Sequence, residues 1–382
     1  MLRTKNKTST CLITNKCPLM TSREKQILQI LRRDPLIPQQ ELAGVLGISR
    51  SAVAGHIMNL MNKGYIKGKG YILSEHRYVV TVGSANMDVC GYSDLNLVYE
   101  DSNPGHIKCS PGGVGRNIAQ NIALLGCESH FISVIGDDFY GNTLYEQAKL
   151  AGVNVSNLHR LHGETTSTYL SLLDPQGEMI TAINDMRILE KLTPALLATS
   201  RDLIRHAGVL VADCNLSEGA LEWLFTNAGN VPVFVDTVSA FKANKIKPWL
   251  SHIHTLKPNR FEAEILTGIK VENKQDVVRA ANALHEQGVQ RIALSMGGEG
   301  VYYSEAGGEN GWSKPFSVHI VNVTGAGDAM MAGLARCWLE GEPLSQSIRF
   351  SQGCSALTLA SELTNNPGLS KDSVHKLMES QA

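Results

Sequence analysis

The chain reads Asn-Val-Thr-Gly-Ala-Gly-Asp at residues 322–328, directly before an apolar segment, 329–339, that has the composition of a helix. Glycines at the start of a helix expose backbone N–H groups, and the helix dipole adds positive potential, so this turn is predicted to bind an anion. The carboxylate of Asp328 would repel a static phosphate, but it suits a hydroxyl that must lose a proton before attacking one. A glycine-rich helix cap without a ligand is the alternative that this turn alone leaves open.

Two more turns carry glycines or polar residues beside predicted helices. Residues 111–117 read Pro-Gly-Gly-Val-Gly-Arg-Asn and would let a ligand approach the backbone closely, although glycine-rich turns are common. Residues 259–262 read Asn-Arg-Phe-Glu and follow a predicted strand. Asn259 and Glu262 lie one helical turn apart and could hold hydrated Mg²⁺ beside a triphosphate. A capping box around Asn259 explains the same pair equally well.

Short apolar runs alternate with helix-like segments from residue 78 onward. The runs predicted as buried strands are 79–82, 131–135, 209–212, 233–235, 253–256 and 292–295. The segments predicted as helices are 116–125, 141–151, 217–228, 260–267 and 274–287. Such alternation is typical of βαβ units, so we expect an α/β fold with a doubly wound, mainly parallel sheet.

Residues 92–110 and 165–184 break this pattern, because apolar and polar positions alternate in both segments. The second segment contains Asp174-Pro175-Gln176-Gly177, which is predicted to be a hairpin turn. We therefore expect the two segments to form a small antiparallel β sheet that projects from the main sheet and serves as a lid.

The N-terminal part of the chain is basic. Residues 1–75 contain twelve Lys and Arg against four Asp and Glu, a net charge of +8, while the whole chain carries −1. A basic N-terminal segment followed by an acidic remainder indicates two domains with different partners. A charged tail and a solvated surface would give the same distribution of charge. Residues 1–18 are polar and lack periodicity, so we expect a disordered leader there.

Residues 19–75 have the pattern of three helices followed by a hairpin. A capping box at Thr21 opens the first helix; the second spans 39–46, and the third begins at Ser49 and runs to about Lys63. We expect the second helix to bury Leu42, Val45 and Leu46. A short polar turn between the second and third helices is the arrangement of a helix-turn-helix motif.

The third helix and the hairpin carry the candidate DNA contacts. Arg50 and Ser51 are predicted to point outward near the start of the helix, where they would enter a major groove. Lys67 and Lys69 lie in a glycine-rich hairpin, 65–73, and suit phosphate contacts. The segment resembles the winged helix-turn-helix domains of bacterial transcription regulators, which implies binding to double-stranded DNA. A helical appendage for dimerisation is the alternative.

The three turns of the larger part, in their order and spacing, resemble the ribokinase-like (PfkB-type) carbohydrate kinases over about residues 77–380. The resemblance implies an ATP-dependent kinase domain spanning 77–382, with Asp328 as the catalytic base and an anion hole formed by the amides of Gly325, Ala326 and Gly327. The residues that it implies for the nucleotide are Asn259, Glu262, Ser295, Gly297, Gly300, Thr324, Gly325 and Gly327, with Glu262 reaching Mg²⁺ through water. The residues that it implies for the substrate are Asn86, Asp88, Gly112, Gly113, Asn117 and Asn215. The family's second signature often begins with Asp where this chain has Asn322, so a monovalent cation such as K⁺ is an open expectation.

Within this family, the strongest resemblance is to the bacterial pseudouridine kinases. The stretches that carry it are 101–105, 111–121, 166–170, 182–186, 211–215, 254–259, 322–333 and 364–367. It implies phosphorylation of the 5′-hydroxyl of pseudouridine, with Thr168, Asn184 and Asp185 as contacts to the base, although lid structure explains these three equally well. A kinase for another nucleoside or a ribose-type sugar stays open, as does a nucleoside-sensing transcription regulator with little kinase activity.

The composition of the chain argues against a membrane protein, a secreted protein and a cysteine-based metal site. No apolar run approaches the roughly 18–20 residues that span a bilayer, and the N-terminus lacks the apolar stretch of a signal peptide, so we expect a cytoplasmic protein without a membrane partner. The eight cysteines are scattered without a CxxC pair, which is typical of reduced thiols rather than of a metal site or disulfides. Family lids often pair between protomers, so the resemblance also implies a homodimer.

Overall fold

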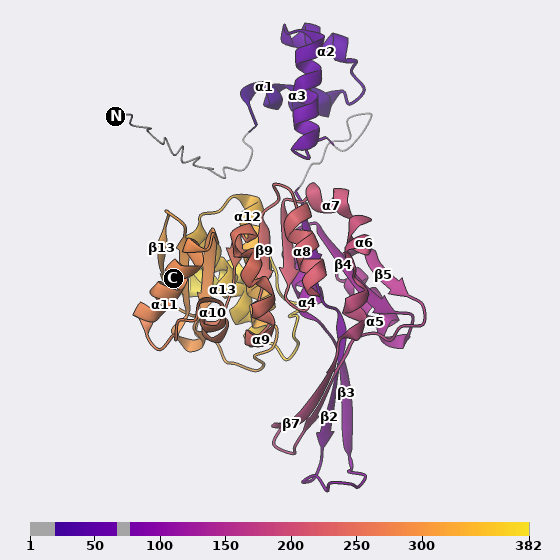
Figure 1. Cartoon of the computed structure of the whole chain (residues 1–382), viewed down its shortest axis with the longest axis vertical. Helices are drawn as coiled ribbons and strands as arrows, with labels where there is room; N and C mark the ends of the chain where they lie inside the picture. The colour runs from indigo at the N-terminus through magenta and orange to yellow at the C-terminus, as the bar shows by residue number, and fades with distance from the viewer. Residues whose placement is uncertain (1–19, 67–76, 382) are drawn as a thin grey trace, which may run out of the picture. The chain divides into compact units, whose positions relative to one another are not determined.

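The computed structural model describes residues 20–66 and 77–381. The chain divides into two compact units, Met1–His76 and Arg77–Ala382. Their described parts are called the N-terminal unit and the C-terminal unit below, and each is treated by itself (Figure 1). The leader at 1–18 lies outside the described residues, as do Lys67 and Lys69 of the predicted hairpin.

The described part of the N-terminal unit contains three helices, α1 (Ser22–Arg33), α2 (Gln39–Leu46) and α3 (Arg50–Asn62). Ser49 caps α3, and α2 ends at Gly47, whose φ of 63° is a left-handed conformation that favours glycine. The helices bury one apolar cluster: Ile27, Leu28, Leu31, Leu42, Val53, Ile57 and Leu60. The prediction that Val45 is buried is wrong, because it lies at the edge of the narrow apolar stripe of a short helix and is 63% exposed, while Ala43 is buried.

An ion pair between the buried Glu24 and the partly exposed Lys63 joins the first and third helices. Glu24 completes the predicted capping box with Thr21, and both of its carboxylate oxygens accept hydrogen bonds from Lys63, at 2.9 and 2.8 Å. Burial raises the pKa of the Glu24 carboxyl, but the bonds from Lys63 and Thr21 outweigh it and hold the pKa below its ordinary value. The start of α1 is therefore fixed to the end of α3.

Among the described residues, the C-terminal unit contains a nine-stranded sheet in the order β13-β12-β11-β10-β9-β8-β1-β4-β5. The neighbours from β5 to β11 are parallel, whereas β12 and β13 are antiparallel to their neighbours. The strands are β1 (Val79–Val82), β4 (Ser129–Gly136), β5 (Asn154–Leu161), β8 (Val209–Asp213), β9 (Val233–Asp236), β10 (Thr255–Leu256), β11 (Arg291–Ser295), β12 (Val301–Glu305) and β13 (Asn310–Ser313). The predicted doubly wound, mainly parallel sheet is confirmed, while β5, β12 and β13 were not predicted.

Helices cover both faces of this sheet. The longer ones are α4 (Val114–Leu124), α5 (Phe139–Leu150), α8 (Glu218–Asn227), α10 (Arg260–Thr267), α11 (Lys274–Glu286), α12 (Ala326–Glu340), α13 (Leu344–Leu359) and α14 (Lys371–Ser380). Shorter pieces are η1 (Arg187–Lys191), α6 (Pro194–Ala198), α7 (Arg201–Arg205), α9 (Ala240–Ala243), η2 (Asn244–His252) and η3 (Gly297–Glu299). None of the helices in these described stretches is long and apolar enough to cross a membrane.

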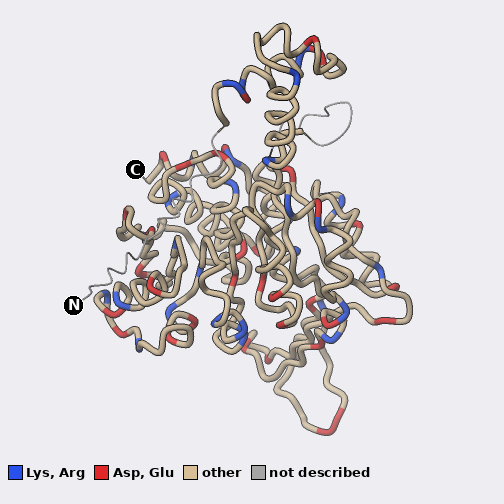
Figure 2. Tube along the Cα trace, turned by 45° about the horizontal axis from the view of Figure 1, so that its top comes forward, with Lys and Arg blue, Asp and Glu red and all other residues tan. Residues whose placement is uncertain are grey.

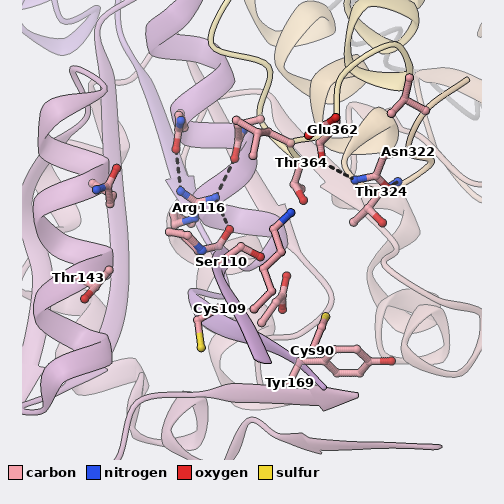
Figure 3. A pocket seen from close by; sticks show the side chains of 18 of the residues that line it. Cys90, Cys109, Ser110, Arg116, Thr143, Tyr169, Asn322, Thr324, Glu362 and Thr364 are labelled. Atoms are coloured by element: carbon pink, nitrogen blue, oxygen red, sulfur yellow. Dashed lines mark hydrogen bonds between the residues drawn. The ribbon is translucent and has the colours of Figure 1, made fainter. Parts of the chain in front are cut away.

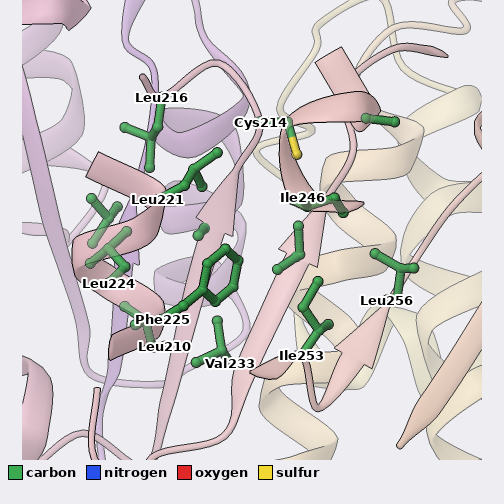
Figure 4. Close-up of a cluster of buried hydrophobic side chains, with 14 of the residues drawn as sticks. Leu210, Cys214, Leu216, Leu221, Leu224, Phe225, Val233, Ile246, Ile253 and Leu256 are labelled. Carbon is green, nitrogen blue, oxygen red and sulfur yellow. The ribbon is translucent and has the colours of Figure 1, made fainter. Parts of the chain in front are cut away.

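Alternation along the strands separates two cores. Val233 and Val235 of β9 face α8, α10 and α11, in the cluster of which Figure 4 shows a part. Phe234, between them in sequence, faces the opposite side, where α4, α12 and α13 pack. The strands are buried on both faces, as expected for a parallel sheet between two helix layers. The carboxyl ends of β1, β8, β9, β10 and β11 consequently meet along one edge of a rigid body.

A second, four-stranded sheet has the order β3-β2-β6-β7 and projects from the body of the C-terminal unit (Figure 1). Its strands are β2 (Asn86–Ser93), β3 (Gly105–Gly112), β6 (Thr168–Leu173) and β7 (Met179–Asp185). The two hairpins are antiparallel, as expected, and they join through a parallel pairing of β2 with β6. The predicted start of the first lid segment at residue 92 is too late, because β2 begins at Asn86 and the alternation of polar and apolar residues already starts there, in Asn86-Met87-Asp88-Val89. We call this sheet the lid.

Candidate active site

Helix α12 begins at the predicted glycine turn and points its N-terminus toward the edge where the strand ends meet. Gly325, with a φ of 84°, is its N-cap, and no side chain of the described residues caps it. In contrast, Asp138 and Asn259 cap α5 and α10 with side-chain hydrogen bonds. The first-turn amides of α12 thus keep their donors available for a ligand, which is the arrangement that binds anions.

Asp328 lies in the first turn of α12 and is 8% exposed. Its Oδ2 accepts a 2.7 Å hydrogen bond from the side-chain amide of Asn117 in α4. Burial raises the pKa of Asp328 to about 8, helped by the negative charges of Asp236 and Asp213, while Asn117 and Lys257 act in the opposite direction. A carboxyl whose pKa is near neutrality is suited to accept and release a proton.

Charged residues at three neighbouring strand ends surround this carboxyl. Asp213 ends β8, and its Oδ2 accepts bonds from both the amide and the hydroxyl of Ser84 (2.8 and 2.9 Å) and from the amide of Gly115 (2.8 Å). Asp236 ends β9 and pairs with Lys257, which follows β10, at 3.1 Å. Asp213 therefore fixes the turn after β1 to the start of α4, and Lys257 brings a buried positive charge toward Asp328.

The glycines of the 111–117 turn allow close packing of the backbone. Gly113 has a φ of 97°, and a Cβ on it would lie 2.6 Å from both the Cα of Ala85 and the carbonyl oxygen of Ser84. A Cβ on Gly112 would collide with the carboxylate of Asp88. Both positions thus require glycine, because the turn lies directly against the start of β2.

The predicted substrate residues Asn86 and Asp88 meet at the base of the lid. The Asn86 amide donates a 2.6 Å hydrogen bond to Oδ1 of Asp88. Burial raises the pKa of Asp88, while the bond from Asn86 and the charge of Arg116 lower it. Asp88 lines a cavity of about 970 Å³ together with Arg116, Tyr169 and Thr324 (Figure 3). The cavity brings the lid base and the turn before α12 into one space.

Register assigns the lid residues to faces. Ser110, Tyr169 and Asn184 lie in one row with Asp88 across the four strands, so these four side chains share a face. Thr168 pairs with Met87 and Asp185 in the next row, and all three lie on the opposite face. Of the predicted base contacts, Asn184 thus shares the face of Asp88, whereas Thr168 does not. Asp185 instead binds Arg187 at 2.7 Å.

Asn215 follows β8 and lies beside Ser84, to whose hydroxyl its amide donates at 2.9 Å. Its Oδ1 accepts a 2.5 Å bond from Lys242, so a positive charge stands next to this predicted substrate residue. The backbone amide of Asn215 also donates to Asp213 at 2.8 Å. The predicted residue is therefore part of a polar cluster that continues from the turn after β1.

The predicted nucleotide residues lie at the carboxyl ends of β10 and β11. Asn259 caps α10 and forms a complete capping box with Glu262, as the alternative interpretation expected. Oε2 of Glu262 accepts bonds from the Asn259 amide and the Thr237 hydroxyl, at 2.8 and 2.5 Å, and no described residue bonds to Oε1. The capping box therefore leaves one carboxylate oxygen available to a hydrated cation.

Ser295 pairs with Asn259 in an isolated parallel bridge, which places the end of β11 beside the start of α10. Gly297 and Gly300 follow in the turn to β12, with φ of 56° and 95°. In the turn before α12, the exposed Thr324 donates its amide to Oδ1 of Asn322 at 2.9 Å. Val238, just after β9, has a φ of 64°, which strains a β-branched residue and is typical of functional sites.

The predicted DNA contacts Arg50 and Ser51 are both exposed at the start of α3. The Ser51 hydroxyl lies 2.9 Å from that of the capping residue Ser49. Lys and Arg are interspersed with acidic residues on the described helices of this unit (Figure 2). Much of the basic charge of residues 1–75 belongs to positions outside the described residues.

Several polar residues of the site were not predicted: Asp213, Asp236, Arg116, Lys257 and Asn365. The first two could have been found, because each is the last residue of a buried parallel strand, at the edge where ligands bind in open α/β sheets. Lys257 follows such a strand as well. Nothing local in the sequence marks Arg116 or Asn365, which are 249 residues apart and meet only in the fold, at 2.7 Å.

Comparison with known proteins gives consistent matches to both parts of the chain. Residues 76–372 match the family model described as pfkB family carbohydrate kinase, and residues 20–67 match that of winged helix-turn-helix DNA-binding domains. Two Escherichia coli K12 proteins are each 55% identical to the chain: an uncharacterized sugar kinase, YeiI, over 94% of the chain and 99% of its own length, and a pseudouridine kinase over 80% and 98%. The solved structure of a carbohydrate kinase from Agrobacterium tumefaciens is 29% identical, with a TM-score of 0.70 over 79% of this chain and 97% of its own.

Proposed function

The chain belongs to the pfkB family of carbohydrate kinases, and we propose that it transfers the γ-phosphoryl group of ATP to the 5′-hydroxyl of pseudouridine. The observation that carries this proposal is the uncapped N-terminus of α12 with Asp328 in its first turn, beside a cavity that also contains Asp88. This arrangement places a base for the attacking hydroxyl beside an anion site for the phosphoryl group that it attacks. The 55% identity to a pseudouridine kinase over 98% of its length supports the choice of substrate.

The mechanism follows from the charges around Asp328. Asp88 accepts hydrogen bonds from the ribose hydroxyls and holds the nucleoside with its 5′-hydroxyl at Asp328. Asp328 accepts the hydroxyl proton as the oxygen attacks the γ-phosphorus; the bond from that phosphorus to the β,γ-bridging oxygen breaks, and ADP leaves. Asp328 is then buried and protonated, the form that its raised pKa favours. The amides of Gly325, Ala326 and Gly327 donate to the oxygens of the transferring group, whose charge is spread over them.

Magnesium and ATP fit the residues at the ends of β10 and β11. The free Oε1 of Glu262 offers a hard oxygen to a hydrated Mg²⁺ ion, and Asn259 holds that carboxylate in place. We assign the nucleotide to Ser295, Gly297 and Gly300, which lie at and after the end of β11, and to Thr324 in the turn before α12. Bound Mg²⁺ would supply charge neutralisation of the phosphates. The turn at Asn322 is the place where a monovalent cation would act on the anion hole, if one is used.

The lid selects the substrate. In pseudouridine the base is joined through carbon, so its N1–H is a free donor where uridine has a C–H group. The row that contains Asp88, Tyr169 and Asn184 faces the cavity side of the lid, and Asn184 offers an amide oxygen to such a donor. Another nucleoside would use the same catalytic base, Asp328, and the same anion hole, and would differ only in these lid contacts.

A second function, binding to double-stranded DNA, is favoured by the match of residues 20–67 to the winged helix-turn-helix model. Arg50 is exposed at the first turn of α3, where recognition helices contact base edges. We propose that the N-terminal unit binds DNA through this helix, with Ser51, and through Lys67 and Lys69 of the segment that follows. The protein would then combine an enzyme with a regulator.

We also propose that the chain forms a homodimer through its lid. One face of the lid carries four exposed apolar side chains: Ile107, Leu170, Leu172 and Ile183. Ile107 and Ile183 are 73% and 64% exposed, on a sheet whose opposite face carries Asp88, Ser110 and Asn184. A continuous apolar sheet face of this kind requires cover, and a second lid offers a surface of the same shape and chemistry.

The test is ATP consumption by the purified chain with pseudouridine, uridine, inosine and ribose in parallel. We expect clear preference for pseudouridine and loss of turnover in Asp328→Ala. Preference for another nucleoside would keep the mechanism and overturn the substrate. Nucleoside binding without turnover would overturn the kinase assignment and favour a nucleoside-sensing regulator.

A further inference from the structure

Arg116 is a buried cation beside the catalytic base that forms no ion pair with any described residue. It is 4% exposed and lies in α4, directly before Asn117. Burial lowers the pKa of Arg116 to about 10, and the charges of Asp88 and Asp328 raise it. An arginine stays protonated under these conditions, so the site contains a permanent positive charge that the mechanism above does not use.

The guanidinium group of Arg116 donates its hydrogen bonds to neutral oxygens. Nε donates to the carbonyl of Gly112 at 2.9 Å, and one terminal nitrogen donates to Gln120 at 2.6 Å. The other terminal nitrogen has acceptors in the carbonyl of Pro111 and in the side chains of Asn117 and Asn365, at 3.0, 2.6 and 2.7 Å. Figure 3 shows bonds radiating from Arg116 at the cavity wall. One side chain thus joins the glycine turn, α4 and the segment after α13.

These bonds fix the direction of the Asn117 amide. An arginine can only donate, so the oxygen of Asn117 must face Arg116 and the NH₂ group must face away. That NH₂ group donates to Asp328 Oδ2 at 2.7 Å. A reversed amide would direct its oxygen at the carboxylate and its hydrogens at the guanidinium group, and both contacts would be repulsive.

Asn365 is oriented in the same way. Its oxygen accepts from Arg116, and its NH₂ group donates to the carbonyl of Asn117 and to the side chain of Asn121, both at 2.9 Å. This holds the backbone of Asn117 as well as its amide. Asn365 lies next to Thr364, whose carbonyl packs against Gly325 at the start of α12. The network therefore connects the base, the anion turn and the substrate turn.

We propose that Arg116 is a positioning residue, which orients the Asn117 amide so that it donates to Asp328 and leaves the other carboxylate oxygen to the substrate hydroxyl. The proposal rests on the kinase function proposed above. All the hydrogen bonds of Arg116 to described residues go to neutral groups of the protein and none goes to Asp328, so its effect on the base is transmitted through Asn117. The charged groups that face Asp328 from the surrounding elements are Asp236, Asp213 and Lys257 together with Arg116.

The test is a double-mutant cycle on the pH dependence of kcat/KM for the nucleoside. Loss of the donor raises the pKa of the base, so Arg116→Met and Asn117→Ala are each expected to move the rising limb to higher pH by about one unit and to lower turnover by about 10-fold at pH 7. The double variant is expected to show no further shift, because both changes remove the same hydrogen bond. Gln120→Ala removes a different acceptor of Arg116, which takes no part in orienting Asn117. This variant is expected to keep the wild-type pH dependence of kcat/KM.

Arg116→Lys separates orientation from charge and serves if the Met variant fails to fold. Lysine keeps the charge but cannot reach both amides with a planar fork, so the limb and turnover are expected to remain shifted. The proposal would be overturned if Arg116→Met kept the wild-type pH dependence of kcat/KM, or if the pH shifts of Arg116→Met and Asn117→Ala added up in the double variant. Complete recovery of the wild-type pH dependence and turnover in Arg116→Lys would overturn it as well. Absence of turnover in the wild-type chain would instead overturn the proposed function.

Discussion

The ammonium group of Lys257 lies 3.1 Å from Oδ2 of Asp236, at the ends of neighbouring parallel strands. A Cβ placed on Gly327 would lie 3.3 Å from the same ammonium group, so Lys257 stands at the anion hole. Burial lowers the pKa of Lys257, but Asp236 and Glu262 raise it more, and the group stays charged. A fixed positive charge here would stabilise the oxygens of the transferring phosphoryl group.

The first prediction is that Lys257→Met lowers kcat by about 10²-fold and changes the KM for the nucleoside little, because the charge acts on the transferring group. The variant leaves Asp236 buried without its partner, so thermal unfolding must be measured beside the kinetics. The double variant Lys257→Met/Asp236→Asn removes that charge as well. It is expected to regain stability without regaining turnover, and recovery of turnover would contradict the prediction.

Asp328 gives a prediction with a definite direction in pH. Its pKa is raised to about 8, chiefly by burial, and the base acts in its deprotonated form. The kcat/KM for the nucleoside should therefore rise with pH until about 8, and Asp328→Asn should lower kcat by about 10²-fold or more. A flat profile between pH 6 and 8 in the wild type would contradict the assignment of the base.

The same shift predicts a stability effect with the opposite sign. Asp328 binds its proton more tightly in the folded than in the unfolded chain, so the folded state loses stability as pH rises from about 4 to about 8. Asp328→Asn should consequently unfold at a higher temperature than the wild type at pH 8, and the difference should shrink toward pH 4. Calorimetry at the two pH values measures it. Equal unfolding temperatures of the wild type and Asp328→Asn at pH 8 would show that folding does not raise the pKa of the Asp328 carboxyl.

The fold and the anion turn could be predicted because their information is local. Seven consecutive residues contain both the glycines of the α12 turn and Asp328. The strand runs and helix caps are equally local, and six of the sheet strands were predicted from apolar runs alone. β5 (Asn154–Leu161) was not predicted, because its sequence mixes polar and apolar residues. It is an edge strand of the described sheet that pairs only with β4, so it is less buried than the central strands.

The remaining parts of the site depend on contacts across the chain. Asn117 and Asp328 are 211 residues apart and meet because α4 and α12 lie on the same face of the sheet. The separation of Thr168 from Asp88 depends on the parallel register between β2 and β6, which no local pattern specifies. Sequence reasoning thus identified individual groups of the site but not the network that orients them.

The lid face leads to a prediction about assembly. Ile183→Glu places a charge on the apolar face, in the edge strand β7, where a partner lid would have to bury it. We expect the dimer dissociation constant to increase by about 10²-fold or more in sedimentation equilibrium over a series of concentrations. Leu150→Glu is the matched control, since Leu150 is an exposed apolar residue at the end of α5 and is not part of the lid sheet. A monomeric wild type, or equal effects of the two substitutions, would contradict assembly through the lid.

The N-terminal unit is tested through the salt dependence of DNA binding by the full chain. Arg50 is exposed at the first turn of α3, so Arg50→Ala should weaken binding to a double-stranded oligonucleotide and reduce the slope of log K against log salt by about 1 if the side chain contacts a phosphate. A base contact would instead weaken binding to a preferred sequence by about 1–3 kcal/mol and leave the slope nearly unchanged. Lys149→Ala removes an exposed charge from α5 of the C-terminal unit and should change neither quantity. Wild-type binding that does not weaken with salt, or an Arg50→Ala variant identical to the control, would exclude α3 as the contact.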